Sequence, residues 1–290
     1  MICNLCPRNC GAERTEQKGG GFCGQPTTPI VARAMLHQWE EPCLVGEHGA
    51  GTVFFSGCSL RCGFCQNMPI SRGGVGKAVS VERLREIFRE LIAQGAACLD
   101  LVTPSQFTPA VLEALGDEDW GVPVVWNCGG YEKAETIRRL EGKVQVYLPD
   151  LKYAMAEPAK AYSGAEDYFE WASEAIPEMF RQTGPYQMED GLLTRGVLIR
   201  HLILPGELEN TRRVIDWVAE NFGPGDVLFS LMSQYTPQEG AEGKLARRVT
   251  KAEYRAAVQY MENCGITDGF TQAPDSAKAE YTPDFDLRGV

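Results

Sequence analysis

The chain has 290 residues, 44% of them hydrophobic, and a formal net charge of −11. This length and apolar content predict one large α/β domain, with or without a small appendage. The negative charge argues against a broad nucleic-acid surface, because phosphate binding requires clustered lysine and arginine. We therefore expect no nucleic-acid partner.

The sequence also lacks signals for a membrane or for secretion. No apolar run reaches the roughly 20 residues that span a bilayer. The first residues show neither the charged nor the apolar region of a secretory signal. We therefore expect no membrane partner and a cytoplasmic location, which suits 11 cysteines kept as thiolates or metal ligands.

Cysteines are concentrated at the start of the chain. Their spacing is C-x2-C-x3-C with a fourth cysteine further on, in a glycine-rich segment too short to fold on apolar burial alone. Bound metal stabilises such a segment directly. Two interpretations stay open, an auxiliary [4Fe–4S] cluster and a structural zinc ion, and both use the same ligands: Cys3, Cys6, Cys10 and Cys23. We predict a metal-binding segment over residues 1–48 and a main domain over residues 49–290.

A second cysteine motif has the spacing C-x3-C-x2-C and consists of Cys58, Cys62 and Cys65. Three thiolates can hold three irons of a cubane cluster. The next cysteine, Cys98, is far downstream, so the motif supplies no ligand for the fourth iron. A zinc site, by contrast, usually closes with a fourth ligand. The motif therefore predicts an iron–sulfur cluster with one iron open to chemistry.

From this motif onward the chain alternates short β-rich runs with amphipathic helical stretches, the pattern of repeated βα units. Strands are predicted over 52–56, 98–103, 122–126, 144–149, 196–204 and 226–231. Helices are predicted over 80–95, 107–115, 131–140, 165–182, 209–222 and 250–263. Pro177 is expected to bend or split the fourth helix, and residues 233–248 are expected to form a loop over the barrel mouth. Six such units make an α/β fold, a partial (β/α)6 barrel.

Polar residues follow several of these predicted strands. In barrels of parallel strands the reactive groups gather at the carboxyl ends of the strands. We therefore expect a site that includes Thr103, Ser105, Asn127, Asp150, Lys152 and Arg200. The charged members also have a purely structural interpretation, an internal salt-bridge network at the barrel mouth. His201, next to Arg200, is expected to be a structural histidine.

Several strings of the sequence resemble those of radical S-adenosylmethionine (SAM) enzymes. The run from Gly57 to Asn67, with Phe64 just before the last cysteine, resembles the signature of that superfamily. The strings Asp150-Leu-Lys and Arg200-His-Leu-Ile-Leu-Pro-Gly resemble those of pyruvate formate-lyase activating enzymes. Leu-Val-Thr-Pro-Ser-Gln-Phe, Cys-Gly-Gly-Tyr and Leu-Met-Ser-Gln-Tyr are most similar to the PflX-type branch.

This resemblance implies the TIM-like partial barrel of radical SAM enzymes and their chemistry. SAM binds the open iron of a [4Fe–4S] cluster, and one electron cleaves it to methionine and a 5′-deoxyadenosyl radical that abstracts hydrogen from a substrate. Asp150, Lys152 and Arg200 would bind the methionine part of SAM, and Phe64 would lie near its adenine. The predicted cofactor-binding residues are Phe64, Asn67, Thr103, Ser105, Asn127, Asp150, Lys152 and Arg200. An anaerobic oxidoreductase with an electron donor such as flavodoxin or ferredoxin is implied.

One string departs from the resemblance, and several functions stay open. The Gly-Gly-Glu string that binds the SAM amino group in many relatives is absent, and Thr103-Pro-Ser stands in its place. A glycyl-radical protein substrate, as for an activase, needs a mouth wide enough for an extended loop. A small-molecule substrate needs a compact pocket, closed by Trp126, Tyr131, Tyr147, Tyr153, Arg200 and Tyr235. Alternatives of other classes are a non-catalytic two-cluster electron-transfer protein and a zinc-stabilised interaction module.

Overall fold

The computed structural model describes residues 2–272 and 283–290. Its strands belong to one sheet in the order β10-β9-β8-β6-β5-β4-β2-β1-β3, with β7 paired to β8 outside this path. The strands are β1 (Ile30–His37), β2 (Ala50–Phe55), β3 (Lys77–Ala78), β4 (Leu99–Val102), β5 (Val124–Cys128), β6 (Val146–Pro149), β7 (Gln187–Glu189), β8 (Leu192–Leu202), β9 (Leu228–Met232) and β10 (Gly269–Thr271).

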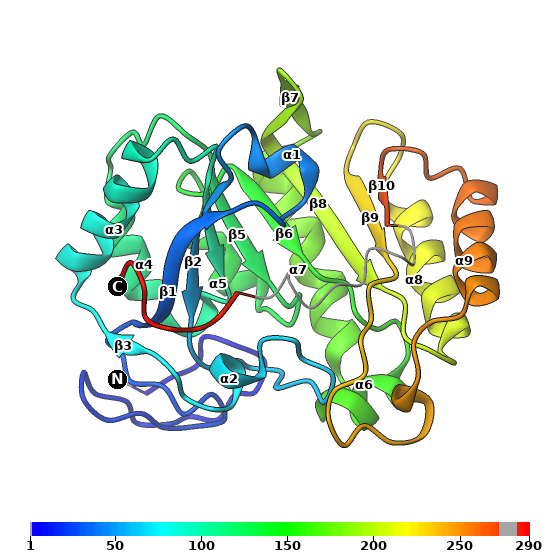
Figure 1. Cartoon of the computed structure of the whole chain (residues 1–290), viewed down its shortest axis with the longest axis horizontal. Coiled ribbons are helices and arrows are strands. Elements are labelled where there is room, and N and C mark those ends of the chain that lie inside the picture. The colour runs from blue at the N-terminus through cyan, green and yellow to red at the C-terminus, as the bar shows by residue number, and fades with distance from the viewer. Residues whose placement is uncertain (1, 273–282) are drawn as a thin grey trace.

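Seven neighbouring strands run parallel. β10, at the edge, was not predicted, and the other six were: β2, β4, β5, β6, β8 and β9. Their arrowheads point toward the same, lower end of the molecule in Figure 1. Helices separate them along the chain. The predicted partial (β/α)6 barrel is therefore confirmed.

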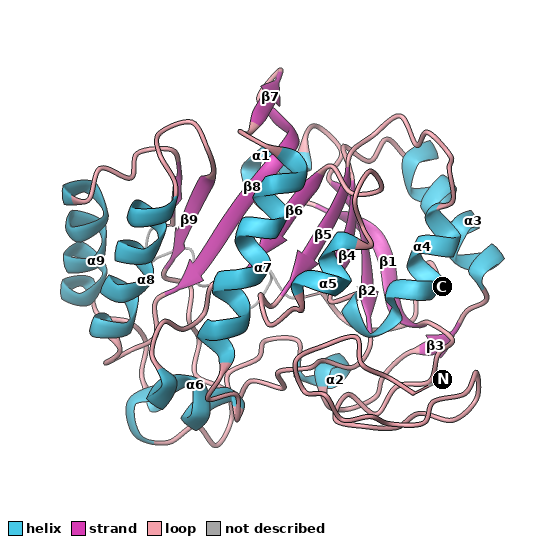
Figure 2. Cartoon of the chain, turned by 180° about the vertical axis from the view of Figure 1, so that it is seen from behind, coloured by secondary structure: helices cyan, strands magenta, loops and turns pink. Residues whose placement is uncertain are grey.

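The long helices cover the outer face of the sheet, which Figure 2 shows from behind. The α-helices are α1 (Pro42–Val45), α2 (Met68–Ser71), α3 (Val81–Ala93), α4 (Thr108–Leu115), α5 (Ala134–Arg138), α6 (Ala156–Ser163), α7 (Tyr168–Thr183), α8 (Leu208–Asn221) and α9 (Lys251–Asn263). Two short 3₁₀ helices are η1 (Ser105–Phe107) and η2 (Gly243–Ala246). None of the described helices has the length and apolar character needed to cross a membrane.

Two helices illustrate how far local signals decide the structure. Ser80 caps α3 by accepting a hydrogen bond from the backbone N–H of Arg83 at 3.1 Å, as its N-cap type predicts. Pro177 lies inside α7, yet the helix continues through it. The predicted split is wrong because one missing backbone donor is tolerated when a helix packs its apolar face firmly on the sheet.

β1 was not predicted. It pairs antiparallel with β2 and belongs to no βα unit, so the alternation of strands and helices gives no sign of it. The predicted boundary at residue 48 falls after β1 and α1, so the sheet includes part of the segment 1–48. Residues 283–290 lie along the other side of β1, where Leu287 N donates to Ala32 O at 3.1 Å and Ala34 N donates to Arg288 O at 3.0 Å.

The barrel interior has two levels. The first, which we call the floor, is apolar. Each of the six predicted strands contributes one residue to it, from the strand itself or from the position just before it: Ala50, Cys98, Val125, Leu148, Leu198 and Leu228. Cys43 and Leu44 of α1 close the floor at the amino ends of the strands. Two positions after each floor residue stands a largely buried polar one. These six form the second level, the polar layer: Thr52, Asp100, Asn127, Asp150, Arg200 and Ser230.

Candidate active site

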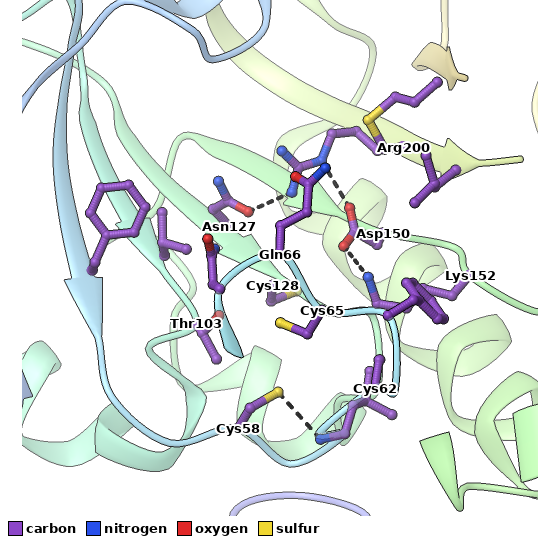
Figure 3. A pocket seen from close by; sticks show the side chains of 18 of the residues that line it. Cys58, Cys62, Cys65, Gln66, Thr103, Asn127, Cys128, Asp150, Lys152 and Arg200 are labelled. Carbon is purple, nitrogen blue, oxygen red and sulfur yellow. Dashed lines mark hydrogen bonds and ion pairs between the residues drawn. The ribbon is translucent and has the colours of Figure 1, made fainter. Parts of the chain in front are cut away.

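A cavity of about 250 Å³ opens on the polar layer at the carboxyl ends of the strands. Of the predicted cluster and cofactor residues of the barrel, all except Ser105 line it: Cys58, Cys62, Phe64, Cys65, Asn67, Thr103, Asn127, Asp150, Lys152 and Arg200. Figure 3 shows the three cysteines in its lower part and Arg200 with Asp150 in its upper part. Ten of the 11 barrel residues predicted for the site therefore lie at one cavity.

The loop that follows β2 carries the three cysteines. Cys58 Sγ accepts a hydrogen bond from Leu60 N at 3.3 Å, and Cys62 Sγ accepts one from Ser163 Oγ at 3.0 Å. Burial raises the pKa of the Cys58 thiol to about 12. Buried thiolates therefore require a nearby positive charge, which a bound metal supplies.

This donor set fits an iron–sulfur cluster. Thiolates are the usual cluster ligands, and the three cysteines of one loop share the cavity with two cationic side chains. Gln106 of η1 fixes the start of the loop, because its side-chain amide donates to Ser56 O at 2.9 Å and to Gly57 O at 3.1 Å. The loop is thus held by the barrel and not by the thiols alone.

Arg200 is the centre of an ionic network in the polar layer. Its Nε lies 2.9 Å from Asp150 Oδ1, and its Nη1 lies 2.9 Å from Glu40 Oε1. Its Nη2 donates to Asn127 Oδ1 at 2.7 Å, and Asn127 Nδ2 donates to Glu40 Oε2 at 3.1 Å. Asp150 Oδ2 pairs with Lys152 Nζ (Figure 3). Two carboxylates and two cations therefore balance each other at the edge of the cavity.

The predicted salt-bridge network is therefore present, and it does not use all the hydrogen-bond donors of its two cations. An ammonium has three donors and a guanidinium five, so Lys152 and Arg200 are not saturated by the contacts above. Burial by itself would raise the pKa of Asp150, but the Arg200 and Lys152 charges hold it below its usual range. The site therefore presents an ionised carboxylate beside two cations, a pattern complementary to a zwitterionic amino acid.

Glu40 lines the cavity and was not predicted from the sequence. It follows β1 and reaches Arg200 across the barrel. In the sequence it stands in the string Glu-Glu-Pro-Cys, which has no spacing that distinguishes it from a solvent-exposed loop. Only the position of β1 beside β2 in the sheet, which brings the residue after β1 to Arg200, could have revealed it.

Two further carboxyls lie inside the barrel. Burial raises the pKa of Asp100 to about 8, and Thr52 Oγ1 lies 3.2 Å from its Oδ2. Burial likewise raises the pKa of Glu41 to about 7. Both carboxyls thus hold their protons further toward neutral pH than exposed ones do. The interior carries fewer negative charges than its count of acidic residues indicates.

Tyr168 of α7 fixes the loops after β5 and β6. Its hydroxyl accepts a hydrogen bond from Lys152 N at 2.9 Å and lies 2.6 Å from Asp150 O and 2.9 Å from Gly129 O. A Cβ at Gly130, whose φ is +75°, would lie 2.0 Å from Asp150 O. The backbone that carries Asp150 and Lys152 therefore approaches the neighbouring loop as closely as only glycine permits.

Thr103 and Ser105 take different places. Thr103 lines the cavity with φ +56°, an uncommon conformation for a non-glycine residue that is often found at functional sites. After this turn η1 directs Ser105 away from the cavity, where its hydroxyl donates to the buried Glu132 Oε1 at 2.5 Å. The expectation that Ser105 binds the cofactor is corrected, because its hydroxyl is used inside the protein.

The aromatic side chains expected to close a small-molecule pocket do not line the cavity. Of that set, only Arg200 does. Trp126 and Tyr147 precede interior positions by one residue, so they point to the helix side of the sheet. Tyr147 accordingly donates to Gln182 of α7 at 2.5 Å. Tyr153 and Tyr235 instead pack edge-on against Phe64, with ring centroids 6.5 and 6.4 Å apart.

His201 has the structural role that was expected. Its Nδ1 lies 2.7 Å from Leu151 O and its Nε2 lies 3.0 Å from Thr211 Oγ1. Burial lowers its pKa to about 4, so the ring is neutral at physiological pH and serves as a hydrogen-bonding spacer between β8 and α8.

The N-terminal segment forms the lobe at the lower left of Figure 1, and none of its four cysteines lines this cavity. Cys3 and Cys23 are buried, Cys6 is half-buried and Cys10 is exposed. Within residues 2–272 and 283–290, no three Cys, His, Asp or Glu side chains form a group that could hold one metal ion.

Comparisons with known proteins agree with this geometry. No protein-family model matches the chain. Methylornithine synthase PylB superposes with a TM-score of 0.51 at 15% identity, over 82% of this chain and 76% of PylB. The fold is a radical SAM-like partial barrel. SuiB of Streptococcus suis superposes with a TM-score of 0.50 at 14% identity, over 77% of this chain, which spans only 48% of SuiB.

A similar sequence is also known. The chain is 27% identical over 283 residues to the uncharacterized protein MJ0674 of Methanocaldococcus jannaschii, over 91% of this chain and 75% of that protein. A match of this length includes the second cysteine motif and the six predicted parallel strands, and it assigns no activity.

Proposed function

We propose that this protein is a radical SAM enzyme. The observation that carries the proposal is that Cys58, Cys62 and Cys65 share one cavity with Asp150, Lys152 and Arg200, at the carboxyl ends of a partial barrel. A [4Fe–4S] cluster at these cysteines would supply the electron for reductive cleavage of SAM, and the resulting 5′-deoxyadenosyl radical would abstract hydrogen from the substrate.

The side chains of the cavity have distinct roles in this proposal. Asp150, ionised beside two cations, accepts hydrogen bonds from the ammonium group of SAM, and Lys152 and Arg200 bind its carboxylate. Glu40 and Asn127 hold the guanidinium plane of Arg200 in one orientation. Burial of this network strengthens each contact by excluding water.

We further propose a protein substrate that presents an extended segment, as for a glycyl-radical enzyme. Of the aromatic residues that would enclose a small molecule, Trp126 and Tyr147 face the helices and Tyr153 and Tyr235 pack against Phe64. The fifth, Tyr131, stacks on Tyr168. The mouth is bordered instead by Trp39, which is 57% exposed, and by Gln234 and Pro283. A flavodoxin or ferredoxin is proposed as electron donor.

Anaerobic reconstitution with iron and sulfide, followed by SAM and dithionite, tests the function. We expect 5′-deoxyadenosine from the intact chain and none above background from Cys58→Ala. The matched control is Cys264→Ala, which removes a half-buried thiol at the end of α9 and should leave the yield unchanged.

SAM binding, followed by its effect on the electron paramagnetic resonance (EPR) spectrum of the reduced cluster, completes the test. A loaded protein that binds SAM and still makes no deoxyadenosine with dithionite, flavodoxin or ferredoxin would contradict the proposal. A loaded protein that does not bind SAM at all would instead favour the two-cluster electron carrier, whose clusters are fully ligated.

A further inference from the structure

The two cysteine loops of this protein share a backbone feature. Each contains a C-x3-C turn, and in both the residue before the second cysteine is left-handed: Asn9 has φ +44° and Arg61 has φ +52°. Non-glycine residues adopt this conformation only where the surrounding structure requires it. We call residues 3–10 the N-terminal loop and residues 58–65 the catalytic loop. The cysteine spacing is C-x2-C-x3-C in the N-terminal loop and C-x3-C-x2-C, the reverse order, in the catalytic loop. The two loops are thus built alike.

The four N-terminal cysteines are held near one another. Cys3 N donates to Ala12 O at 2.9 Å, which places Cys3 beside the residues that follow Cys10. A Cβ at Gly21 would lie 2.4 Å from Cys10 Sγ, so the turn before Cys23 packs on that thiol. Asn9 N donates to Cys6 O at 3.2 Å, which forms a turn that brings Cys6 toward Cys10.

A buried cation faces this group. Arg14 is 1% exposed, and its Nη1 donates to Cys3 Sγ at 3.2 Å. The guanidinium thus places a positive charge beside a sulfur that would carry negative charge as a metal ligand. Arg14 Nη2 also donates to Gln106 O at 2.8 Å, and Gln106 holds the start of the catalytic loop. Charge and hydrogen bonding therefore both point to ligation at these four cysteines.

Arg8 connects the N-terminal loop to the catalytic loop. It stands between Cys6 and Cys10 in sequence, and its Nε donates to Ser59 O, between Cys58 and Cys62, at 2.7 Å. The ring of Phe22, the residue before Cys23, lies 4.0 Å from the guanidinium carbon. Phe22, next to Cys23, therefore packs on the guanidinium, and the backbone of Arg8 belongs to the turn between Cys6 and Cys10.

Arg8 also caps the carboxyl end of α6. Its Nη2 donates to Ser163 O at 2.8 Å and its Nη1 to Gly164 O at 2.5 Å. The same Ser163 donates its hydroxyl hydrogen bond to Cys62 Sγ at 3.0 Å. Hydrogen bonds to cluster sulfurs tune the reduction potential. Arg8 therefore contacts the backbone of the catalytic loop directly, and it contacts Ser163, which donates to the sulfur of Cys62 in that loop.

We propose that Cys3, Cys6, Cys10 and Cys23 form a second, four-thiolate metal site, and that its metal fixes Arg8 as a bridge to the loop of Cys58, Cys62 and Cys65. A [4Fe–4S] cluster and a zinc ion both accept four thiolates. As they are placed here, the four thiols do not form a group that could hold one metal ion, so a zinc ion would have to draw them closer together. The part that concerns the catalytic cluster rests on the proposed function. Loss of the N-terminal metal would release Arg8 and change the surroundings of the catalytic cluster.

Metal analysis of the anaerobically reconstituted chain tests the site itself. Two [4Fe–4S] clusters give about eight irons per chain, whereas zinc at the N-terminal site gives about four irons and one zinc. Cys6→Ser combined with Cys10→Ser should lose only the N-terminal metal. Replacing Cys58, Cys62 and Cys65 by alanine should lose only the other. A wild-type chain with no metal beyond the catalytic cluster overturns the proposal.

Arg8→Ala tests the bridge without removing a ligand. We expect the N-terminal metal to stay, the EPR spectrum of the reduced catalytic cluster to shift, and deoxyadenosine formation to fall about tenfold, the effect typical of residues that orient metal ligands. Arg8→Lys should recover part of both, because an ammonium can bond to some of the three carbonyls but lacks the planar fork. An unchanged spectrum in Arg8→Ala overturns the bridge.

Arg195→Ala is the matched control. Arg195 caps the end of α7 by donating to Thr183 O at 2.7 Å and Gln182 O at 3.0 Å, just as Arg8 caps α6. It lies at the opposite end of the barrel, before the parallel part of β8, so its loss should leave the cluster spectrum unchanged. If no variant cleaves SAM, the proposed function fails, while metal content and spectra still decide this inference.

Discussion

The floor and the polar layer of the barrel lie two residues apart on the same six strands, yet they contribute differently. The floor removes apolar side chains from water, and such burial stabilises the fold wherever the volumes fit. The polar layer buries charge, which costs desolvation energy that pairing repays only in part. A region kept at that cost is the one where function is expected. The comparison predicts that substitutions in the floor change stability and those in the polar layer change SAM binding as well.

The largest effect should come from Arg200→Met. This change leaves Glu40 without its cationic partner and Asp150 with only Lys152, and removing one member of a buried ion pair costs about 3–5 kcal/mol. SAM binding should be lost at the same time. Urea unfolding and titration of SAM against the reduced cluster measure the two effects.

A second substitution separates these effects. Glu40→Gln added to Arg200→Met removes the unpaired charge, so it should restore part of the stability and none of the SAM affinity. If SAM affinity returned with stability, the polar layer would be structural only.

Leu148→Ala tests the floor. Leu148 is fully buried and precedes Asp150 by two residues. The cavity left by such a change costs about 2–5 kcal/mol in unfolding free energy. SAM affinity per folded molecule should stay within twofold of the wild type. A large loss of affinity at full folding would show that the two levels are not separable.

Asp100→Asn uses pH to probe the polar layer. The folded state raises the pKa of Asp100 to about 8 from 3.8, so between these values the unfolded chain releases a proton that the folded chain keeps. Stability from this group is therefore lost as pH rises from about 4 to about 8. A carboxamide at this position cannot titrate. As the pH rises from 5 to 8, the unfolding free energy of the variant should therefore increase by more than about 1 kcal/mol relative to that of the wild type.

Thermal unfolding across that pH range measures the difference. Asp119→Asn, on an exposed loop that bonds only locally to Gly121, is the matched control and should follow the wild-type profile. A variant at position 100 with the wild-type slope would show that Asp100 is ionised in the folded state.

The smallest effect should come from Tyr147→Phe. Tyr147 faces α7 and donates to Gln182, so its loss removes one hydrogen bond worth about 1 kcal/mol. SAM affinity and deoxyadenosine yield should not change, because the hydroxyl lies on the helix side of the sheet. A fall in yield would return Tyr147 to the substrate pocket.

The sequence predicted the barrel well because its signals are local. Alternation of apolar strands with amphipathic helices is a property of short windows, and the carboxyl ends of parallel strands meet wherever such a barrel forms. This is why Asp150, Lys152 and Arg200 were found together with the cysteine loop.

The remaining features depend on register and on distant contacts. The predicted strand ended at Trp126, whereas β5 runs to Cys128. This error of two residues placed the Trp126 side chain at the barrel mouth in the prediction, but in the structure it faces the helices. Glu40 could not be found because its partner Arg200 lies 160 positions away. Ser105 was misplaced because the left-handed turn at Thr103 has no sequence signal.

The residues that lie along β1 have a consequence for solubility. An uncovered strand edge offers its backbone donors and acceptors to another chain and is a template for aggregation. In this protein Leu287 and Arg288 occupy backbone positions of Ala32 and Ala34 on that edge. A chain cut before Leu287 would therefore keep its barrel and cavity residues but would expose the backbone donors and acceptors of β1. A poor yield of such a variant would indicate self-association through this strand and not misfolding of the site.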